Sequence, residues 1–195
     1  MKKIFGLIIF TLIIFSANCF AAKTPPEEYV LNDFMPYGDG TAGVNIRLKM
    51  NGNCNLYNLP RGSKVVGSLQ SGDFINVTDS RVYTKPLLHP VRVSRTTQVA
   101  TSPKGEFQTT VYAGDYIYLL MPITKDSGYI AWYNGGILWL HGKITNFDTA
   151  EYTGFVYEGG PSDRKLSIDL WLYVTKESDG LGGWAWIDYK PSGVR

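Results

Sequence analysis

From Val44 onward the chain alternates short apolar runs with turn residues. The runs are four to eight residues long and rich in Val, Ile, Tyr, Trp and Thr, and Gly, Asn, Asp and Pro separate them. β-Branched and aromatic residues favour strands, and the separating residues favour turns. No window places apolar residues at the helical period between capping residues. We therefore predict an all-β fold with at most one helical turn.

Eleven segments carry this strand pattern. They are expected at residues 44–50, 64–69, 74–78, 91–94, 107–112, 116–121, 129–133, 137–141, 154–157, 167–175 and 184–189. Asn134-Gly135 stands between the seventh and the eighth segment, and asparagine followed by glycine accepts the positive φ of a tight hairpin. Ser178-Asp179-Gly180 stands between the last two segments. We therefore predict a β-hairpin at each of these two turns.

Residues 1–21 have the three-part pattern of a secretory signal peptide. Lys2 and Lys3 provide the positive start, residues 4–15 form an apolar run, and small residues precede a cleavage point after Ala21. The run is shorter than the roughly 20 residues that a membrane-spanning helix needs. We expect a secreted, periplasmic or cell-envelope protein, with no membrane insertion after signal cleavage. Lipidation at Cys19 is the alternative fate of this segment.

Cleavage of the signal peptide changes the charge and the thiol content of the chain. The loss of Lys2 and Lys3 leaves 17 basic residues against 17 acidic ones. A neutral protein has no long-range field that would attract nucleic acid, and we expect no nucleic-acid partner. Cys54 is then the remaining thiol, so no intramolecular disulfide is expected, and the fold must be stabilised by its core.

Two phrases of the sequence recur. Pro60-Arg61-Gly62 and Gly72-Asp73-Phe74-Ile75 are echoed by Pro103-Lys104-Gly105 and Gly114-Asp115-Tyr116-Ile117, at distances of 43 and 42 residues. Two copies fall short of the three or more that make a repeat convincing. An internal duplication and a chance similarity between turns both stay open. Residues 22–43, which are rich in proline and glycine and have little periodicity except around residues 29–34, are interpreted as a leader arm or loop.

Two parts of the sequence resemble bacterial Src-homology-3-like (SH3b-type) domains. Residues 55–77 contain, in the order typical of that family, Pro60-Arg61-Gly62, the strand Val65-Val66-Gly67 and the turn Gly72-Asp73. Residues 170–189 resemble the closing half of the family pattern, a tryptophan strand, an acidic-glycine turn and a Gly-Trp strand. The resemblance implies small SH3-like barrels and non-catalytic binding of cell-wall peptides or other envelope ligands.

The two halves enclose more residues than one such domain contains, which leaves two domain arrangements open. In the first, one barrel carries a long β insertion: residues 44–99 form its first half, and residues 100–195 hold the insertion and the closing strands. In the second, residues 44–99 and residues 100–195 are two barrels in tandem. The doubled Gly-Asp turn favours the tandem, and the lack of a Gly-Trp closure before residue 100 disfavours it.

Cysteine-based chemistry lacks its usual sequence context. A cysteine nucleophile commonly sits at a helix start with a histidine in reach, whereas Cys54 precedes a strand, His89 lies in a loop and His141 ends a strand. One cysteine and two histidines at this spacing also form no familiar zinc motif. We expect no catalytic residues, no metal and no cofactor.

Paired carboxylates are the remaining route to an enzyme. A glycosidase needs two acids at the right separation, and Asp115, Asp126, Asp169 and Asp188 are available. Acids beside turns usually cap backbone amides, so we expect structural roles for them. An envelope hydrolase therefore stays the least favoured function.

Aromatic residues are the most informative side chains. All five tryptophans lie between residues 132 and 186. Strand alternation places Trp171 with Tyr173, and Trp184 with Trp186, on the faces opposite the aliphatic positions. Together with Tyr57 these residues form our predicted ligand-binding set.

The aromatic face has two interpretations. If it is open, its rigid rings form a platform that can stack on a sugar or grip a peptide with little loss of entropy. If the inserted strands cover it, it forms a second core, and large exposed apolar patches are indeed rare on soluble monomers.

We therefore expect an exported, non-catalytic binding module that recognises a cell-wall (peptidoglycan) peptide, a glycan or an envelope protein. An inhibitor or immunity-type protein for an envelope enzyme is the alternative.

Overall fold

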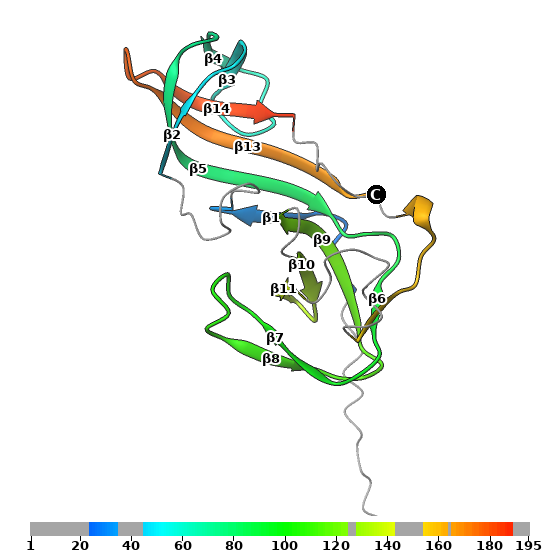
Figure 1. The fold of residues 1–195 in the computed structure, drawn as a ribbon. Coiled ribbons are helices and arrows are strands. Elements are labelled where there is room, and N and C mark those ends of the chain that lie inside the picture. Colours follow the sequence, from blue (N-terminus) through cyan, green and yellow to red (C-terminus); the bar gives the residue numbers. More distant parts are fainter. Residues whose placement is uncertain (1–23, 35–44, 125–127, 143–153, 164, 189–195) are drawn as a thin grey trace, which may run out of the picture.

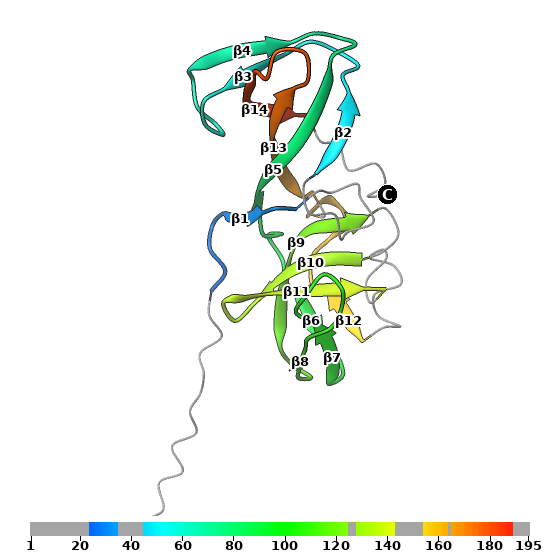
Figure 2. The same ribbon diagram turned by 90° about the vertical axis from the view of Figure 1, so that its left-hand side faces the viewer.

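The computed structural model of the protein describes residues 24–34, 45–124, 128–142, 154–163 and 165–188. Within them the chain forms two antiparallel sheets of seven strands each and one short 3₁₀ helix, η2. Figures 1 and 2 show the two sheets one above the other, with β5 and β13 as the longest strands of the upper one. The prediction of an all-β fold is confirmed.

The first sheet is built from strands at both ends of the chain. Its order is β1-β5-β13-β14-β3-β4, and β2 also pairs with β5. The strands are β1 (Tyr29–Asn32), β2 (Ile46–Lys49), β3 (Cys54–Tyr57), β4 (Val65–Leu69), β5 (Phe74–Lys85), β13 (Ser167–Lys176) and β14 (Gly182–Ile187).

The second sheet is built from the part of the chain between β5 and β13. Its order is β12-β6-β9-β10-β11-β7-β8. The strands are β6 (Val91–Val93), β7 (Thr97–Ala100), β8 (Gln108–Val111), β9 (Tyr116–Thr124), β10 (Gly128–Tyr133), β11 (Gly136–His141) and β12 (Phe155–Tyr157), and η2 (Pro161–Asp163) follows them.

Each of the eleven expected segments overlaps a strand, but the sequence pattern missed three others. β1, β3 and β7 are only four residues long, which is too short for an apolar alternation to stand out in the sequence. β1 lies inside the 22–43 segment that we interpreted as a leader arm, where it pairs with β5. The expected boundary between residues 99 and 100 falls inside β7. β5 continues to Lys85 rather than ending at Thr78.

Both predicted hairpins are present. β10 and β11 pair so that Tyr133 lies opposite Gly136, and the two residues between them, Asn134 and Gly135, have φ values of 50° and 95°. Two consecutive positive φ values are the mark of the tight turn that matches the twist of the flanking strands. β13 and β14 form the second hairpin, with Gly180 at a φ of 71° in its loop.

The two sheets share one strand order. Five neighbours of the first sheet, β5-β13-β14-β3-β4, correspond to five neighbours of the second, β9-β10-β11-β7-β8. β2 pairs with β5 as β6 pairs with β9. We call β2–β5 with β13 and β14 the first unit, and β6–β11 the second unit. The second unit thus lies in the chain between β5 and β13, the third and fourth of the five strands that the first unit has in common with it.

The turn before β5 has a characteristic hydrogen-bond pattern. Gly72 has a φ of 95°, and the Asp73 N–H donates to the Gln70 carbonyl over 3.1 Å. The Asp73 carboxylate accepts from the Gln70 N–H over 2.8 Å. Met50 brackets the turn, because its N–H donates to Asp73 and its carbonyl accepts from Gly72, each over 2.8 Å.

The turn before β9 repeats every one of these contacts. Gly114 also has a φ of 95°, the Asp115 N–H donates to the Tyr112 carbonyl over 3.0 Å, and the Asp115 carboxylate accepts from the Tyr112 N–H over 2.8 Å. Val93 brackets this turn as Met50 brackets the other, again with two bonds of 2.8 Å. The sequence echo at the Gly-Asp turns therefore reflects a repeated local structure.

The two units also share one irregularity, although the pairing of β10 with β9 has a second register shift, between Gly128 and Tyr129, that the pairing of β13 with β5 lacks. The pairing of β13 with β5 shifts register between Tyr173 and Val174, and the pairing of β10 with β9 shifts between Ile130 and Ala131. A bulge at the same place in both units is hard to obtain by coincidence, because bulges are specific local features.

The pairing of β14 with β3, and of β11 with β7, gives a residue-by-residue correspondence between the two units. β14 meets β3 where Trp184 lies opposite Tyr57, and β11 meets β7 where Trp139 lies opposite Ala100. Trp184 and Trp139 therefore occupy equivalent positions.

Equivalent positions also supply the cores of the two units. The pairs are Leu56 and Val99, Leu69 and Val111, Ile75 and Ile117, Val77 and Leu119, and Ala185 and Leu140. In the second unit these residues form a separate cluster together with Phe155 and Leu87.

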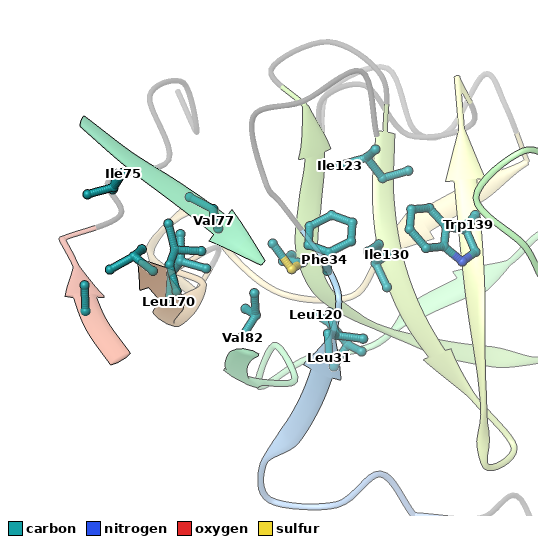
Figure 3. Packing of buried hydrophobic residues seen from close by; sticks show 14 of the residues in the cluster. Leu31, Phe34, Ile75, Val77, Val82, Leu120, Ile123, Ile130, Trp139 and Leu170 are labelled. Carbon is teal, nitrogen blue, oxygen red and sulfur yellow. The ribbon is translucent and has the colours of Figure 1, made fainter. Parts of the chain in front are cut away.

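A shared cluster joins the two sheets (Figure 3). Ile130 and Trp139 of the second unit pack in the same cluster as Val82 and Leu170 of the first, with Phe34 between them. Beside it, the buried Thr84 hydroxyl donates to the Leu120 carbonyl over 2.5 Å. The inserted strands therefore pack against the aliphatic face of the first sheet.

The predicted signal peptide, residues 1–21, lies outside the described residues. Among the helices of the described part, none is long and apolar enough to cross a bilayer.

Candidate ligand-binding site

The hairpin of β13 and β14 separates two kinds of side chain. One face of the hairpin belongs to the core cluster, and it carries Leu170, Leu172, Val174 and Ala185. These residues share a face because successive side chains along a strand point to opposite sides of the sheet. The other face of the hairpin carries the predicted aromatic residues. Across the two strands Trp171 lies opposite Trp186, and Tyr173 lies opposite Trp184.

The aromatic residues differ in exposure. Trp171 is 7% exposed and Trp184 is 6% exposed, whereas Trp186 is 51% exposed. Tyr57 and Tyr173 are partly buried. The predicted set is thus brought together, but only Trp186 offers a largely open ring.

The two buried tryptophans are covered by neighbours on their own face. Tyr57 meets Trp171 edge to face, with ring centroids 5.6 Å apart, and Tyr173 meets Trp184 in the same way at 5.5 Å. The guanidinium of Arg81 on β5 lies 5.0 Å from the Trp184 ring. The inserted strands, which we considered as a cover for this face, pack on the opposite side of the sheet.

Asp169 fixes two of the indoles. Its Oδ1 accepts hydrogen bonds of 2.9 Å from the Nε1 atoms of both Trp171 and Trp186. Its Oδ2 accepts one of 2.5 Å from Nε of Arg61. Hydrogen bonds to a charged acceptor contribute about 1.5–3 kcal/mol each. The half-exposed Trp186 ring is therefore held in one orientation although much of it faces solvent.

Arg61 connects the loop between β3 and β4 to the aromatic face of the β13–β14 hairpin. Besides Asp169, it binds both carboxylate oxygens of Glu28 over 2.8 and 3.0 Å and lies 3.9 Å from the centre of the Tyr83 ring. The hydrogen bond from Arg61 holds the pKa of Glu28 below its usual value. Arg61 itself has a φ of 58°, an uncommon conformation for a residue with a side chain.

An open pocket of about 520 Å³ lies beside Trp186, and we call it the β3–β4 pocket. This volume is within the range of roughly 300–1,000 Å³ that small-molecule sites occupy. Its lining comes from β3, β4, the segments next to them and β14. The lining residues are Asn53, Cys54, Asn55, Tyr57, Ser68, Leu69, Gln70 and Trp186.

Several polar side chains of this pocket are available to a ligand. In the described part of the chain, the side chains of Asn55, Ser68 and Gln70 make no hydrogen bond. Asn53 uses its Oδ1 to accept from the Ser71 N–H over 2.8 Å, which fixes that side chain at the rim. The pocket thus combines one open aromatic ring with free amide and hydroxyl groups.

Cys54 lies in the pocket but without a catalytic setting. The thiol is half-buried, and burial raises its pKa, which keeps it protonated. Its strand belongs to the first sheet, whereas His89 lies near Asp163, at 3.6 Å, and His141 stacks on Trp139. The structure therefore does not bring Cys54 together with either histidine.

The carboxylates that we considered for glycan hydrolysis have structural contacts. Asp115 caps its turn and accepts a 2.6 Å hydrogen bond from the Tyr133 hydroxyl. Asp169 binds two indoles and Arg61. Asp188 also makes an interaction, and Asp126 lies outside the described residues. Within the described residues, no three His, Cys, Asp or Glu side chains are grouped as a metal ion would need.

Sequence reasoning missed the polar half of the site. It identified the aromatic residues, but gave no role to Asn55, Ser68 or Gln70 and did not connect Arg61 with Asp169. The alternation of Asn53 and Asn55 around Cys54 was the available signal, since it marks the solvent side of a strand.

Searches against models of protein families, against characterised proteins and against solved structures find no match to this chain.

Proposed function

We propose that this protein is an exported, non-catalytic binding module that recognises a glycan of the cell envelope at the β3–β4 pocket. The observation that carries the proposal is the setting of Trp186. The residue is 51% exposed, its Nε1 donates to Asp169, and it lines a pocket with free amide and hydroxyl side chains.

This combination matches the chemistry of a sugar ring. A pyranose has a face of C–H groups that packs on an aromatic ring, and a rim of hydroxyls that both donate and accept hydrogen bonds. An amide side chain can hydrogen-bond to these hydroxyls as donor and as acceptor, because Asn and Gln carry both kinds of group. An indole that is already fixed loses little entropy when a ligand binds.

The charge of the pocket also favours a neutral polar ligand. Its lining, as far as the chain is described, includes no Asp, Glu, Lys or Arg. A wall peptide with free carboxylates or amines would find no opposite charge there. We therefore favour a glycan over a peptide as the occupant.

The topology is compatible with the SH3-like resemblance, which we retain as part of the proposal. The strand that opens the resemblance, β3, pairs with the strand that closes it, β14. The Pro-Arg-Gly loop supplies Arg61, which anchors the loop to Asp169 beside the pocket.

The proposal is tested by binding to isolated wall material. Purified peptidoglycan, glycan strands freed of their peptides, and the isolated stem peptides serve as three separate probes. We expect the wild type to bind the first two. Trp186→Ala should lower the affinity about 30-fold, since removing a central aromatic anchor costs about 2 kcal/mol.

Tyr112→Ala is the matched control, because Tyr112 is an exposed aromatic residue of the second unit, outside the pocket lining. It should bind like the wild type, and all three proteins should melt cooperatively. Binding to stem peptides alone would replace the glycan by a peptide ligand. Failure to bind any of the probes, with a stoichiometric protein partner recovered from envelope extracts, would favour the inhibitor or immunity function instead.

A further inference from the structure

The second unit has its own pocket, with a volume of about 750 Å³. It lies where β11 meets the β7–β8 hairpin, and we call it the β7–β8 pocket. Its lining residues are Thr97, Gln98, Val99, Ala100, Pro103, Lys104, Gly105, Gln108, Trp139 and His141.

This pocket occupies the place in the second unit that the β3–β4 pocket occupies in the first. Both lie where the last of the five corresponding strands pairs with the first of them, at Trp184 opposite Tyr57 and at Trp139 opposite Ala100. Two residues further along those last strands stand Trp186 and, in the second unit, His141. Both of these rings line their pockets.

The polar positions correspond as well. By the hairpin registers, Asn55 of the first pocket matches Gln98 of the second, and Cys54 matches Thr97. An amide therefore stands at the same position in both pockets. In the loops that follow, Arg61 and Lys104 occupy the same place in the two Pro-x-Gly phrases.

The second pocket differs in that the basic residue of its Pro-x-Gly loop is not held by acidic side chains of the described residues. Arg61 is bound to Glu28 and Asp169, whereas Lys104 is exposed and makes no ion pair with any described residue. The side chain of Gln108 is likewise without a hydrogen bond in the described part. Beside them the ring of His141 lies parallel to Trp139, with centroids 5.9 Å apart and planes 18° apart.

We propose that the β7–β8 pocket is a second glycan-binding site, which makes a single chain bivalent for one polymer. The inference rests on the proposed function, because the ligand class is taken from the first pocket. The site presents the His141 ring for stacking and the Gln108 and Lys104 side chains to the hydroxyl rim. An imidazole covers less of a sugar than an indole, so the second site is the weaker one.

Two linked sites have a measurable consequence on a polymer. Once one site is occupied, the second binds at a high effective concentration, and avidity can exceed the single-site affinity by roughly 10²–10⁴-fold. Both sites must reach the same polymer for this gain. A short fragment, which fills one pocket at a time, gains nothing from the second pocket.

The test measures stoichiometry with short peptide-free glycan fragments and affinity for long peptide-free strands, using the full mature chain. The wild type should bind two fragments per chain. Trp186→Ala and His141→Ala should each bind one, and each should lose at least about tenfold in affinity for the long strands. His89→Ala, which changes a partly buried histidine outside both pockets, is the matched control and should behave like the wild type.

Each outcome separates the two proposals. One fragment per wild-type chain, with binding abolished by Trp186→Ala and unaffected by His141→Ala, would overturn the second site and leave the proposed function standing. No binding of any fragment by the wild type would overturn both. A variant that fails to melt cooperatively is replaced by Gln108→Ala for the second pocket or Asn55→Ala for the first, with the same expected stoichiometry.

Discussion

The two units share one strand order, but equivalent faces of their sheets have different surroundings. In the second unit, the face that carries Ile130 and Trp139 packs against the first sheet, so it contributes to the cluster that joins the units. In the first unit the equivalent face carries Tyr173 and Trp184 and packs on neither core cluster. One face is therefore an interface within the molecule, whereas its counterpart lies at the surface.

This difference shows how an aromatic face is kept ordered without a covering layer. A sheet face that packs on another sheet is stabilised mainly by apolar burial. The first unit lacks such a partner on this side and uses specific contacts instead: the edge-to-face ring pairs, Arg81 over Trp184, and the Asp169 carboxylate between two indoles. Among the five predicted aromatic residues, Trp186 alone is left largely open.

Trp184 and Trp139 are both buried, at 6% and 8% exposed, so each should matter for stability despite its different surroundings. Replacing either by alanine removes a buried indole, which typically costs about 3–5 kcal/mol. Denaturant unfolding of Trp184→Ala and Trp139→Ala should show losses of this size in both. A loss below about 1 kcal/mol for Trp184 alone would mean that the aromatic face of the first unit contributes little to its packing.

Gly128 is the clearest point where the units must differ. It is the counterpart of Trp171, but its φ is 114°, and an added Cβ would lie 2.0 Å from the Leu140 carbonyl oxygen. Gly128→Ala should therefore destabilise the protein by about 3 kcal/mol through steric overlap and backbone strain.

Gly142→Ala is the control for Gly128→Ala, since Gly142 also has a positive φ, of 58°, but has nothing within 4 Å of an added Cβ. Thermal melting should show a clearly smaller loss for it. Equal losses in the two variants would mean that the close approach of Leu140 is not what requires glycine at residue 128.

Asp169→Asn tests the contacts that order the aromatic face. The amide cannot pair with Arg61 as a charged acceptor, and we expect a loss of about 2 kcal/mol in unfolding free energy. Glycan affinity should also fall, because Trp186 loses its charged acceptor. Unchanged affinity in a stably folded variant would show that Trp186 binds without help from Asp169.

Alkaline pH should act through the second unit. Burial, and then the hydrogen bond to Asp115, raise the pKa of Tyr133 to about 12 from the ordinary value of 10.0. A raised folded-state pKa contributes stability that is complete below pH 10 and is lost as pH rises toward 12, because the unfolded chain releases the proton first. The melting temperature should fall across this window, and Tyr133→Phe should fall less. Parallel curves for the two proteins would contradict the assignment.

The sequence predicted those parts of the fold that depend on neighbouring residues. The alternation of apolar and polar residues identified the strands of the two hairpins. Asn134-Gly135 identified the turn between β10 and β11, because asparagine and glycine are the residues that most readily accept positive φ values. β1 and β3 escaped notice, since four-residue strands owe their existence to partners far along the chain.

The candidate site was predictable only in its aromatic half. Strand alternation is enough to place Trp171 and Trp186 on one face. The contacts of Arg61 with Glu28 and Asp169 join residues 33 and 108 positions apart, which no local pattern reveals. The match between Trp184 and Trp139 was hidden for the same reason, because it rests on strand pairing and not on similarity of sequence.

The most direct test of the glycan site follows the indole N–H signals of the five tryptophans by nuclear magnetic resonance while peptide-free glycan strands are added. We predict that the Trp186 signal shifts first and furthest, that the Trp171 signal follows because it shares the Asp169 acceptor, and that Trp132 in the core shifts least. A saturating ligand that leaves the Trp186 signal in place would contradict the account.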